Sequence, residues 1–393
     1  MALSVAEAAQ PLEANVSFAS FRSSSPDGSE ESREERLLKA MVLAAGAATG
    51  LYPLTYTLPT ALVPVLNRPS IEHILDWLGA HQVEEVVINL HYLHASVRQA
   101  LQPRVEAGAK PKLHLTVEAE LSGTAGGVAL AQDHFDDTFC VVSADCVTDL
   151  DLQKMLEFHR AKRALCTIAG VPRQEERHFG LMEVSDSGRV LRFCEKPSKA
   201  DSGLNWVNTG IYIIEPDIFA RIPDVRPFDF GEHLFPTMVG KRGGVFCYKA
   251  PEGTFWNDID EPLAYRETHR EVLHSQGPLL VIGEETRPQV FAGEDCQISP
   301  EAIIVPPVQF GDQVVIRKGA RVEGPVVLGR GVVVGEDAQI SDSVIWQNTM
   351  IEDGAKVHSS LIGSSCHLYR NMTYEGVLLA SGARFERKGI SSD

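Results

Sequence analysis

Four short segments of the sequence carry residues that could do chemistry. Asp145 ends the apolar run VVSAD, and Asp258 lies far along the chain in WNDID. Either carboxylate can hold an oxygen-seeking cation or simply cap a helix or turn. Lys196, in CEKP, can hold a phosphate or lie solvated in a turn. Gly46 and Gly50 fall in LAAGAATGL, where they allow the backbone to approach a base or a phosphate, or form an ordinary turn.

These residues lie in a region where strand-like and helix-like patterns alternate. The apolar run at residues 39–46 is typical of a buried parallel strand, and Ile71, Ile74 and Leu78 recur at helical spacing. Further strands are expected at VEEVVINL, LHLTVE and DTFCVVSAD, and further helices at HASVRQAL, TAGGVALAQ and LQKMLEFHRAK. The alternation predicts an α/β fold with a doubly wound, mostly parallel, Rossmann-like sheet. Ligands bind beyond the carboxyl ends of such strands, which makes the loops after Ala45 and Asp145 the candidate site.

The last third of the chain shows a different period. From residue 298 to residue 346 every sixth residue is apolar, and a small or apolar residue follows each of them four positions later. The register slips by one at Ile351, and Trp346 falls within it as a core residue. This hexapeptide repeat predicts a left-handed parallel β-helix of about three to four coils. A β-sandwich would instead show a period of two.

Length, composition and charge limit the remaining possibilities. The chain has 393 residues and a net charge of −17, which argues against binding to nucleic acid or to an anionic membrane. We expect a disordered tail at 1–36, an α/β domain at 37–275 and the β-helix at 285–388. There is no apolar run long enough for a transmembrane helix and no pattern of a signal peptide. The seven cysteines form no Cys-x-x-Cys pair, which favours free thiols in a reducing cytoplasm.

Several ordered motifs give the chain a family resemblance. The stretch KAMVLAAGAATGLYPLTYTLPTALVPVLNRPSIEHIL resembles the opening of the sugar-1-phosphate nucleotidyltransferases, also called nucleoside-diphosphate-sugar pyrophosphorylases. INLHYL, LSGTAGG, SADCVTDLDL, GRVLRFCEKP, VNTGIYIIEPDIF and FWNDIDEP follow in the family's order, so that the resemblance spans about residues 38–385. Many members, including the mannose-1-phosphate guanylyltransferase type, also carry a hexapeptide β-helix. The resemblance implies an enzyme that forms an NDP-sugar and pyrophosphate from an NTP and a sugar 1-phosphate, as a precursor for polysaccharides or glycoconjugates.

The resemblance also implies a role for individual residues. Asp145 and Asp258 would hold Mg²⁺, and Lys196 would position the attacking phosphate, so that Asp145 and Lys196 are the candidate catalytic residues. The candidate nucleotide-binding residues are Leu43, Ala44, Ala45, Gly46, Gly50, Gly123 and Thr124. The candidate sugar-phosphate-binding residues are Glu195, Lys196, Asn208, Thr209 and Gly210.

The sequence lacks two basic residues that the family pattern contains. The family loop reads close to GG-x-GTRL, but its arginine is Gly50 here and its preceding glycine is Ala48, while the lysine of P-K-x-L is Thr60. The DIGTP turn reads DIDEP at residues 258–262, which adds two negative charges. Losing one preorganised charge contact costs about 10²–10³ in rate. We therefore expect the Gly50→Arg/Thr60→Lys variant to gain activity.

Two other functions stay open, the first because of the departures at Gly50 and Thr60 and the second because of the hexapeptide repeat. The chain could be a catalytically impaired homologue that binds a sugar nucleotide and regulates an active partner. A hexapeptide acyltransferase would use a histidine of the β-helix, for which His358 and His367 are the candidates. The sequence leaves the base and the sugar undetermined, and we expect a homo-oligomer formed through the β-helix.

Overall fold

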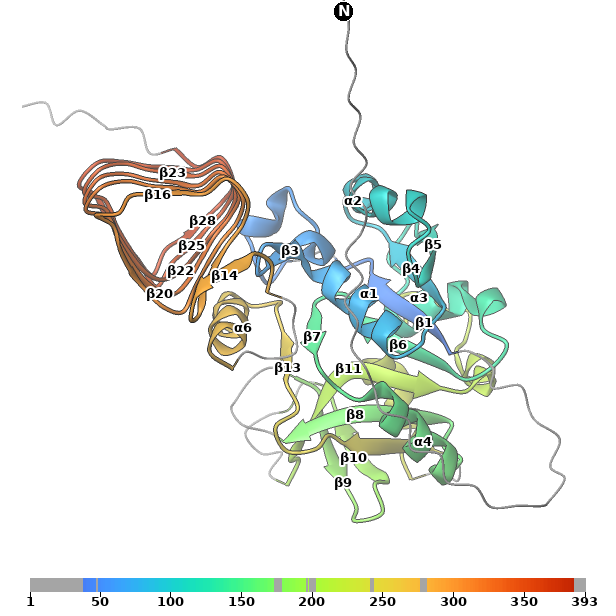
Figure 1. Cartoon of the computed structure of the whole chain (residues 1–393). Coiled ribbons are helices and arrows are strands. Elements are labelled where there is room, and N and C mark those ends of the chain that lie inside the picture. Colours follow the sequence, from blue (N-terminus) through green and yellow to red (C-terminus); the bar gives the residue numbers. More distant parts are fainter. Residues whose placement is uncertain are drawn as a thin grey trace, which may run out of the picture. The chain divides into compact units, whose positions relative to one another are not determined.

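The structure is a computed structural model that describes residues 38–46, 49–172, 179–195, 197, 203–240, 244–275 and 281–384. The predicted tail, residues 1–36, lies outside these ranges, and so does Lys196. Across the described ranges, no helix combines the length and the apolar composition that crossing a bilayer requires. Figure 1 labels many of the elements named below.

The first part of the described chain folds around a nine-stranded sheet with the strand order β10-β9-β11-β6-β1-β4-β5, in which β8 pairs with β11 and β12 (Figure 1). The strands are β1 (Lys39–Ala44), β4 (Glu85–Leu90), β5 (Lys112–Val117), β6 (Phe139–Ser143), β8 (Cys166–Pro172), β9 (Leu181–Val184), β10 (Val190–Cys194), β11 (Trp206–Ile214) and β12 (Val245–Lys249). Strands β6, β1, β4 and β5 run parallel, whereas β11 pairs antiparallel with β6, β8 and β9. The α/β class is confirmed, and the sheet as a whole is mixed.

Helices cover both faces of this sheet. They are α1 (Ser70–Ala80), α2 (His94–Glu106), α3 (Thr124–Leu130), α4 (Leu152–Lys162) and α5 (Phe235–Met238), with short helical turns η1 (Leu54–Tyr56), η2 (Thr60–Leu62), η3 (Gln132–His134), η4 (Pro216–Arg221) and η5 (Phe230–Leu234). A further helix, α6 (Pro262–Ser275), packs instead against the C-terminal part of the chain. Alternate residues of β1 point to opposite faces, because Ala40 packs with the cluster that contains α1, α2 and α4, and Met41 with the cluster that contains α3 and α5. The doubly wound arrangement therefore follows from two apolar faces on each central strand.

The C-terminal part is a parallel β-helix, drawn as a triangular coil in Figure 1. Its strands are β14 (Glu284–Arg287), β15 (Val290–Ala292), β16 (Gln297–Ile298), β17 (Ile303–Val305), β18 (Val308–Phe310), β19 (Val315–Ile316), β20 (Arg321–Leu328), β21 (Val333–Val334), β22 (Gln339–Ile345), β23 (Met350–Ile351), β24 (Lys356–His358), β25 (Leu361–Ile362), β26 (His367–Leu368), β27 (Thr373–Glu375) and β28 (Leu378–Leu379). From β15 on, the pairs between successive coils are parallel. The apolar residues at six-residue spacing from Phe310 to Ile340 fill the interior, as the repeat predicts, whereas Ile298 is exposed.

The register slip lies earlier than the sequence pattern suggests. Val322 pairs with Ile340, but Leu328 pairs with Ile345, because residues 324–325 stand opposite Asp342 alone. Ile345 therefore takes the interior position predicted for Trp346. Trp346 is buried instead in the joint between the β-helix and the rest of the chain, so its predicted place in the β-helix core is wrong.

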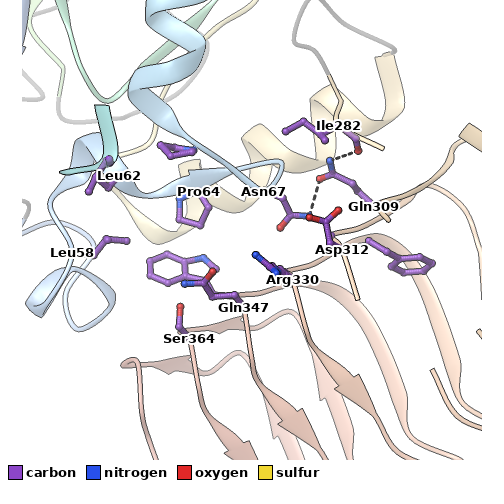
Figure 2. A pocket seen from close by; sticks show the side chains of 17 residues that line it. Leu58, Leu62, Pro64, Asn67, Ile282, Gln309, Asp312, Arg330, Gln347 and Ser364 are labelled. Carbon is purple, nitrogen blue, oxygen red and sulfur yellow. Dashed lines mark hydrogen bonds between the residues drawn. The ribbon is translucent and has the colours of Figure 1, made fainter. Parts of the chain in front are cut away.

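The joint is formed by α6 and by a hairpin of strands β2 (Pro64–Val65) and β3 (Arg68–Pro69). Trp346 Nε1 donates to the hydroxyl of Tyr265 on α6 at 3.0 Å. The buried Gln309 donates through Nε2 to the carbonyl of Leu66, at the tip of the hairpin, at 3.1 Å. A cavity of about 410 Å³ lies beside these contacts, and Figure 2 shows its lining. Hydrogen bonds therefore supplement the apolar packing of this joint.

Two buried histidines hold the hairpin. His73 of α1 contacts the carbonyl of Val65 through Nε2 at 2.9 Å. His269 of α6 accepts from the N–H of Leu66 through Nε2 at 3.2 Å and donates to the carbonyl of Tyr265 through Nδ1 at 3.1 Å. These partners require a neutral His269, because a protonated ring has no acceptor. Burial lowers the pKa of His73 to about 4. Burial and the neighbouring His73 together lower the pKa of His269 to about 3.

The two histidines predict a loss of stability in mild acid. Below the unfolded pKa of 6.5 the unfolded chain binds more protons than the folded chain, so the free energy of unfolding falls as pH decreases. We expect a loss of about 2 kcal/mol for each histidine between pH 7.5 and pH 5. His73→Gln, which can still donate to Val65, should remove about half of this loss when denaturant unfolding is measured at several pH values.

The matched control is His274→Gln, on the exposed side of α6. This variant should keep the full acid sensitivity. Equal pH slopes for the wild type and His73→Gln would contradict the assignment of the effect to the buried pair.

Candidate functional site

The structure brings the two predicted carboxylates side by side. Asp145 follows β6, and the short strand β7 (Cys146–Thr148) continues from it. Strand β13 (Trp256–Asp258) pairs antiparallel with β7, with Asp258 opposite Cys146. The N–H of Ile259 donates to the carbonyl of Asp145 at 3.0 Å. Backbone pairing therefore fixes the two aspartates as neighbours at the rim of the sheet, although they lie far apart in the sequence.

The surroundings of these carboxylates disfavour their negative charge. Burial raises the pKa of Asp258 well above its ordinary value, and the nearby carboxylates of Asp145 and Asp260 raise it further. Burial also raises the pKa of Asp145, against the hydrogen bond that the Ser143 hydroxyl donates to it. A divalent cation would relieve this repulsion, and carboxylate oxygens are the ligands that Mg²⁺ prefers. The donor set therefore fits Mg²⁺.

The glycine-containing loop begins at the carboxyl end of β1. The carbonyl of Leu43 accepts from the N–H of Ala144 at 3.0 Å, which places the start of the loop beside Asp145. A Cβ built on Gly46 would meet no atom of the described residues within 4 Å, so this backbone is open to a ligand. Ala45 is buried, and residues 47–48 lie outside the described ranges.

Gly50 lies directly against the turn that follows β13. A Cβ at Gly50 would lie 2.1 Å from the backbone oxygen of Asp260 and 3.1 Å from its carbonyl carbon. The N–H of Asp260 donates in turn to Oδ1 of Asp258 at 3.1 Å. Gly50, which stands where the family has an arginine, is therefore in contact with the altered DIDEP turn. The turn occupies the space that a side chain at residue 50 would need.

The second predicted nucleotide segment, around Gly123 and Thr124, is held by residues 228–230. Gly123 has a φ of +76°, and a Cβ there would lie 2.6 Å from the backbone nitrogen of Phe228. The N–H and hydroxyl of Thr124 both donate to Asp229 Oδ1, at 2.9 and 3.1 Å, and its hydroxyl accepts from the N–H of Phe230 at 2.9 Å. These bonds shape the segment, and a direct contact of Thr124 with the nucleotide stays a prediction.

The predicted sugar-side residues 208–210 form a bulge in β11. The pairing of β11 with β8 shifts between Asn208 and Tyr212, and Gly210 has a φ of +74°. The ideal Cβ position of Gly210 lies 3.7 Å from Cβ of Ser143, so that the bulge borders the carboxylate pair. Thr209 is buried and donates to the carbonyl of Ala169 at 2.8 Å, which makes its side chain part of the core. Bulges often redirect side chains near active sites.

Glu195 lies in a tight space between two glycines. A Cβ at Gly180 would lie 2.7 Å from Oε2 of Glu195, and one at Gly231 only 1.9 Å from the same oxygen. Asn208 lies beside Gly180, with 3.5 Å between its Cβ and the ideal Cβ position of the glycine. Glu195 and Asn208 thus border the same space, whereas Lys196 falls outside the described residues.

The sequence analysis missed several residues that organise this site. Ser143 binds Asp145, Asp229 binds Thr124, and Asn89 and Glu118 lie between the two nucleotide segments. A usable signal existed for Asn89, because a lone amide inside the apolar run VVINL must find a partner when it is buried. The other contacts depend on strand order and loop shape, which the sequence pattern does not specify.

Comparisons with known proteins find matches along most of the chain. The family model described as "Nucleotidyl transferase" matches residues 39–275, and the model described as "GMPPB C-terminal domain" matches residues 304–388. A UTP–glucose-1-phosphate uridylyltransferase of Synechocystis sp. is 31% identical over 83% of this chain and 87% of its own length. A probable mannose-1-phosphate guanylyltransferase of Arabidopsis thaliana is 31% identical over 91% of this chain and 98% of its own.

Solved structures show the same fold. HddC from Yersinia pseudotuberculosis, in a crystal structure with GMP-PN, superimposes with a TM-score of 0.51 at 21% identity, over 59% of this chain and 98% of that one. A putative glucose-1-phosphate thymidylyltransferase from Bacillus anthracis gives a TM-score of 0.54 at 20% identity, over 63% of this chain and 98% of that one. These structures support the α/β architecture of the part that carries the candidate site.

Proposed function

The chain belongs to the nucleotidyl transferase family and is a sugar-1-phosphate nucleotidyltransferase, and we propose that its reaction takes place where Asp145, Asp258 and the loop at residues 43–51 meet. The observation that carries this placement is the β7–β13 pairing, which joins the two carboxylates beside the loop. An oxygen of the sugar phosphate attacks the α-phosphorus of the NTP, the bond to the pyrophosphate breaks, and pyrophosphate leaves. No covalent intermediate on the protein is required.

The residues divide this task by position. The backbone of the 43–51 loop and the segment at Gly123 hold the nucleotide, and the open space at Gly46 supports the first of these roles. Glu195 and Asn208 bind the sugar hydroxyls. Their positions support this role, because both residues border the same space beside Gly180. Lys196 holds the phosphate of the sugar, by resemblance to the family motif alone.

We further propose that Asp145 and Asp258 hold Mg²⁺. When bound, this ion supplies positive charge to phosphate oxygens that become more negative during the transfer. The mutual repulsion of the two buried carboxylates supports the assignment. Asp145 is kept in place by Ser143, and Asp258 by the N–H of Asp260.

The comparisons favour this transferase over the two alternatives. The relatives described above carry the names of transferases, and nothing favours a regulatory homologue over them. For an acyltransferase, His358 would have to face a substrate, but its Nδ1 contacts the Ser341 hydroxyl at 2.7 Å, and His367 contacts Glu352 at 2.7 Å. Both histidines are thus engaged within the wall of the β-helix.

Cellular location and assembly are part of the same proposal. The seven cysteines are all free, which supports a reducing compartment such as the cytoplasm. Self-association through the β-helix is proposed by resemblance to the family alone.

An assay of pyrophosphate release tests the function and identifies the substrates. The full chain with Mg²⁺ is incubated with GTP, UTP, ATP or dTTP, each combined with mannose 1-phosphate or glucose 1-phosphate. We expect equal amounts of pyrophosphate and NDP-sugar from at least one pair. Absence of turnover with every pair, together with micromolar binding of an NDP-sugar, would instead support the regulatory homologue.

A further inference from the structure

We propose that Asn89 and Glu118 are a positioning pair that holds the two nucleotide segments, residues 43–51 and 121–127, at a fixed distance from each other. The inference rests on the proposed function, because it assigns those segments to the nucleotide. It adds two residues to which the family resemblance gave no role, and it predicts that their effect falls on the nucleotide rather than on the sugar phosphate.

The pair forms a continuous chain of hydrogen bonds between the two segments. The N–H of Ala44, where the first segment begins, donates to Asn89 Oδ1 at 3.0 Å. Asn89 Nδ2 donates to Glu118 Oε1 at 2.5 Å. Glu118 Oε2 accepts from the N–H of Ser122, in the second segment, at 2.9 Å. At each end of this series of hydrogen bonds, the donor is thus a backbone amide of one of the two nucleotide segments.

The direction of these bonds is fixed. A backbone N–H can only donate, so Ala44 requires the oxygen of Asn89 and turns its amide nitrogen toward Glu118. The carboxylate of Glu118 offers acceptors on both of its oxygens, which matches the amide of Asn89 on one side and Ser122 on the other. Neither group can therefore be replaced alone without leaving a mismatched hydrogen bond.

Burial makes the hydrogen bonds of Asn89 and Glu118 costly to disturb. Asn89 is 3% exposed and Glu118 is 7% exposed. A Cβ on Gly127 of α3 would lie 2.7 Å both from Asn89 Nδ2 and from Glu118 Oε1, so that the helix backbone packs directly on the pair. A buried polar group that loses its partner costs far more than an exposed one, which is why a mismatch here should move the loops.

Exchanging the two functional groups provides a sharp test. In Asn89→Asp two carboxylates face each other, and in Glu118→Gln two amide groups compete as donors. In Asn89→Asp/Glu118→Gln, the carboxylate at position 89 accepts from Ala44 and from the new amide, whose oxygen accepts from Ser122. The double variant keeps every hydrogen bond and reverses only the order of charge and amide.

The experiment measures binding of GTP and UTP by calorimetry, steady-state kinetics and Tm for the full chain, the two single variants and the double variant. We expect each single variant to weaken nucleotide binding about tenfold, and the double variant to recover most of this loss. The KM for the sugar 1-phosphate should stay within about threefold of the wild-type value. The matched control exchanges Gln102 and Glu106, an exposed amide–carboxylate pair on α2 at 2.8 Å, and should change none of these values.

The other outcomes separate the inference from the proposed function. Single variants that bind nucleotide as tightly as the wild type, or a double variant as weak as the singles, would overturn the positioning role. So would equal increases in the KM of both substrates with a parallel loss of Tm, since that result indicates a merely structural role. A wild type whose nucleotide binding depends on this pair but which transfers nothing would overturn only the proposed function, and a wild type that binds no nucleotide would overturn both.

Discussion

Asp258→Asn is expected to lower kcat by about 10³ while raising the Tm measured without divalent cations. The loss of activity follows because one of two carboxylates proposed to hold Mg²⁺ becomes a neutral amide. The gain in Tm follows because Asp258 is buried beside the carboxylates of Asp145 and Asp260, and the amide removes their repulsion. Pyrophosphate release and thermal unfolding, each measured with EDTA and with Mg²⁺, check both parts.

The combination of a lower kcat with a higher Tm makes this prediction specific to a metal site. In the wild type, Mg²⁺ should raise the Tm, whereas in Asp258→Asn this increase should nearly disappear, because binding to the folded state is lost. Asp151→Asn is the matched control, since Asp151 caps α4 through its side chain, which asparagine can also do. A variant that loses Tm together with activity, or keeps the full response to Mg²⁺, would contradict the proposed role of Asp258.

The alternation of short apolar runs and helical spacing was enough to predict the α/β core. Helix α1 and strand β4 lie where the pattern places them, because a buried parallel strand and an amphipathic helix each leave a local signature. The antiparallel insertion of β11 left no such signature, since its apolar residues would fit either direction. Trp346 was wrongly predicted in the interior of the β-helix for a similar reason. One residue, Asp342, stands opposite the two residues 324–325, and this changes the register without changing the apolar spacing nearby.

The site was predictable only as far as it depends on motifs. The resemblance singled out Asp145 and Asp258, and the β7–β13 ladder shows how the backbone brings them together. The contact between Gly50 and Asp260 could not be read from the sequence, because it joins a loop to the backbone of a distant turn. Asn89 and Glu118 meet because β4 and β5 are adjacent, and strand order is a property of the whole sheet.

Thr60→Lys is expected to raise kcat/KM by about 10- to 100-fold, and Gly50→Arg is expected to lower it. The lysine would restore one cation near the phosphates, and the half-buried Thr60 donates no hydrogen bond from its side chain among those of the described residues. At Gly50 the obstacle is backbone, because even a Cβ would lie 2.1 Å from the oxygen of Asp260. The Gly50→Arg/Thr60→Lys variant should therefore be less active than Thr60→Lys alone, which revises the gain expected from the sequence.

The cause of the loss at Gly50 can be separated from the charge of arginine. Gly50→Ala adds only the Cβ, and it should lose about as much activity as Gly50→Arg if the collision with Asp260 decides the outcome. Because Asp260 also donates its N–H to Asp258, moving this turn should weaken the response of Tm to Mg²⁺ in both variants. Asp260→Gly frees the peptide to rotate, so adding it should rescue Gly50→Arg, whose side chain then supplies a cation, more than Gly50→Ala. A Gly50→Arg variant that is more active than the wild type without Asp260→Gly would show that the turn yields easily and does not hold residue 50 as a glycine.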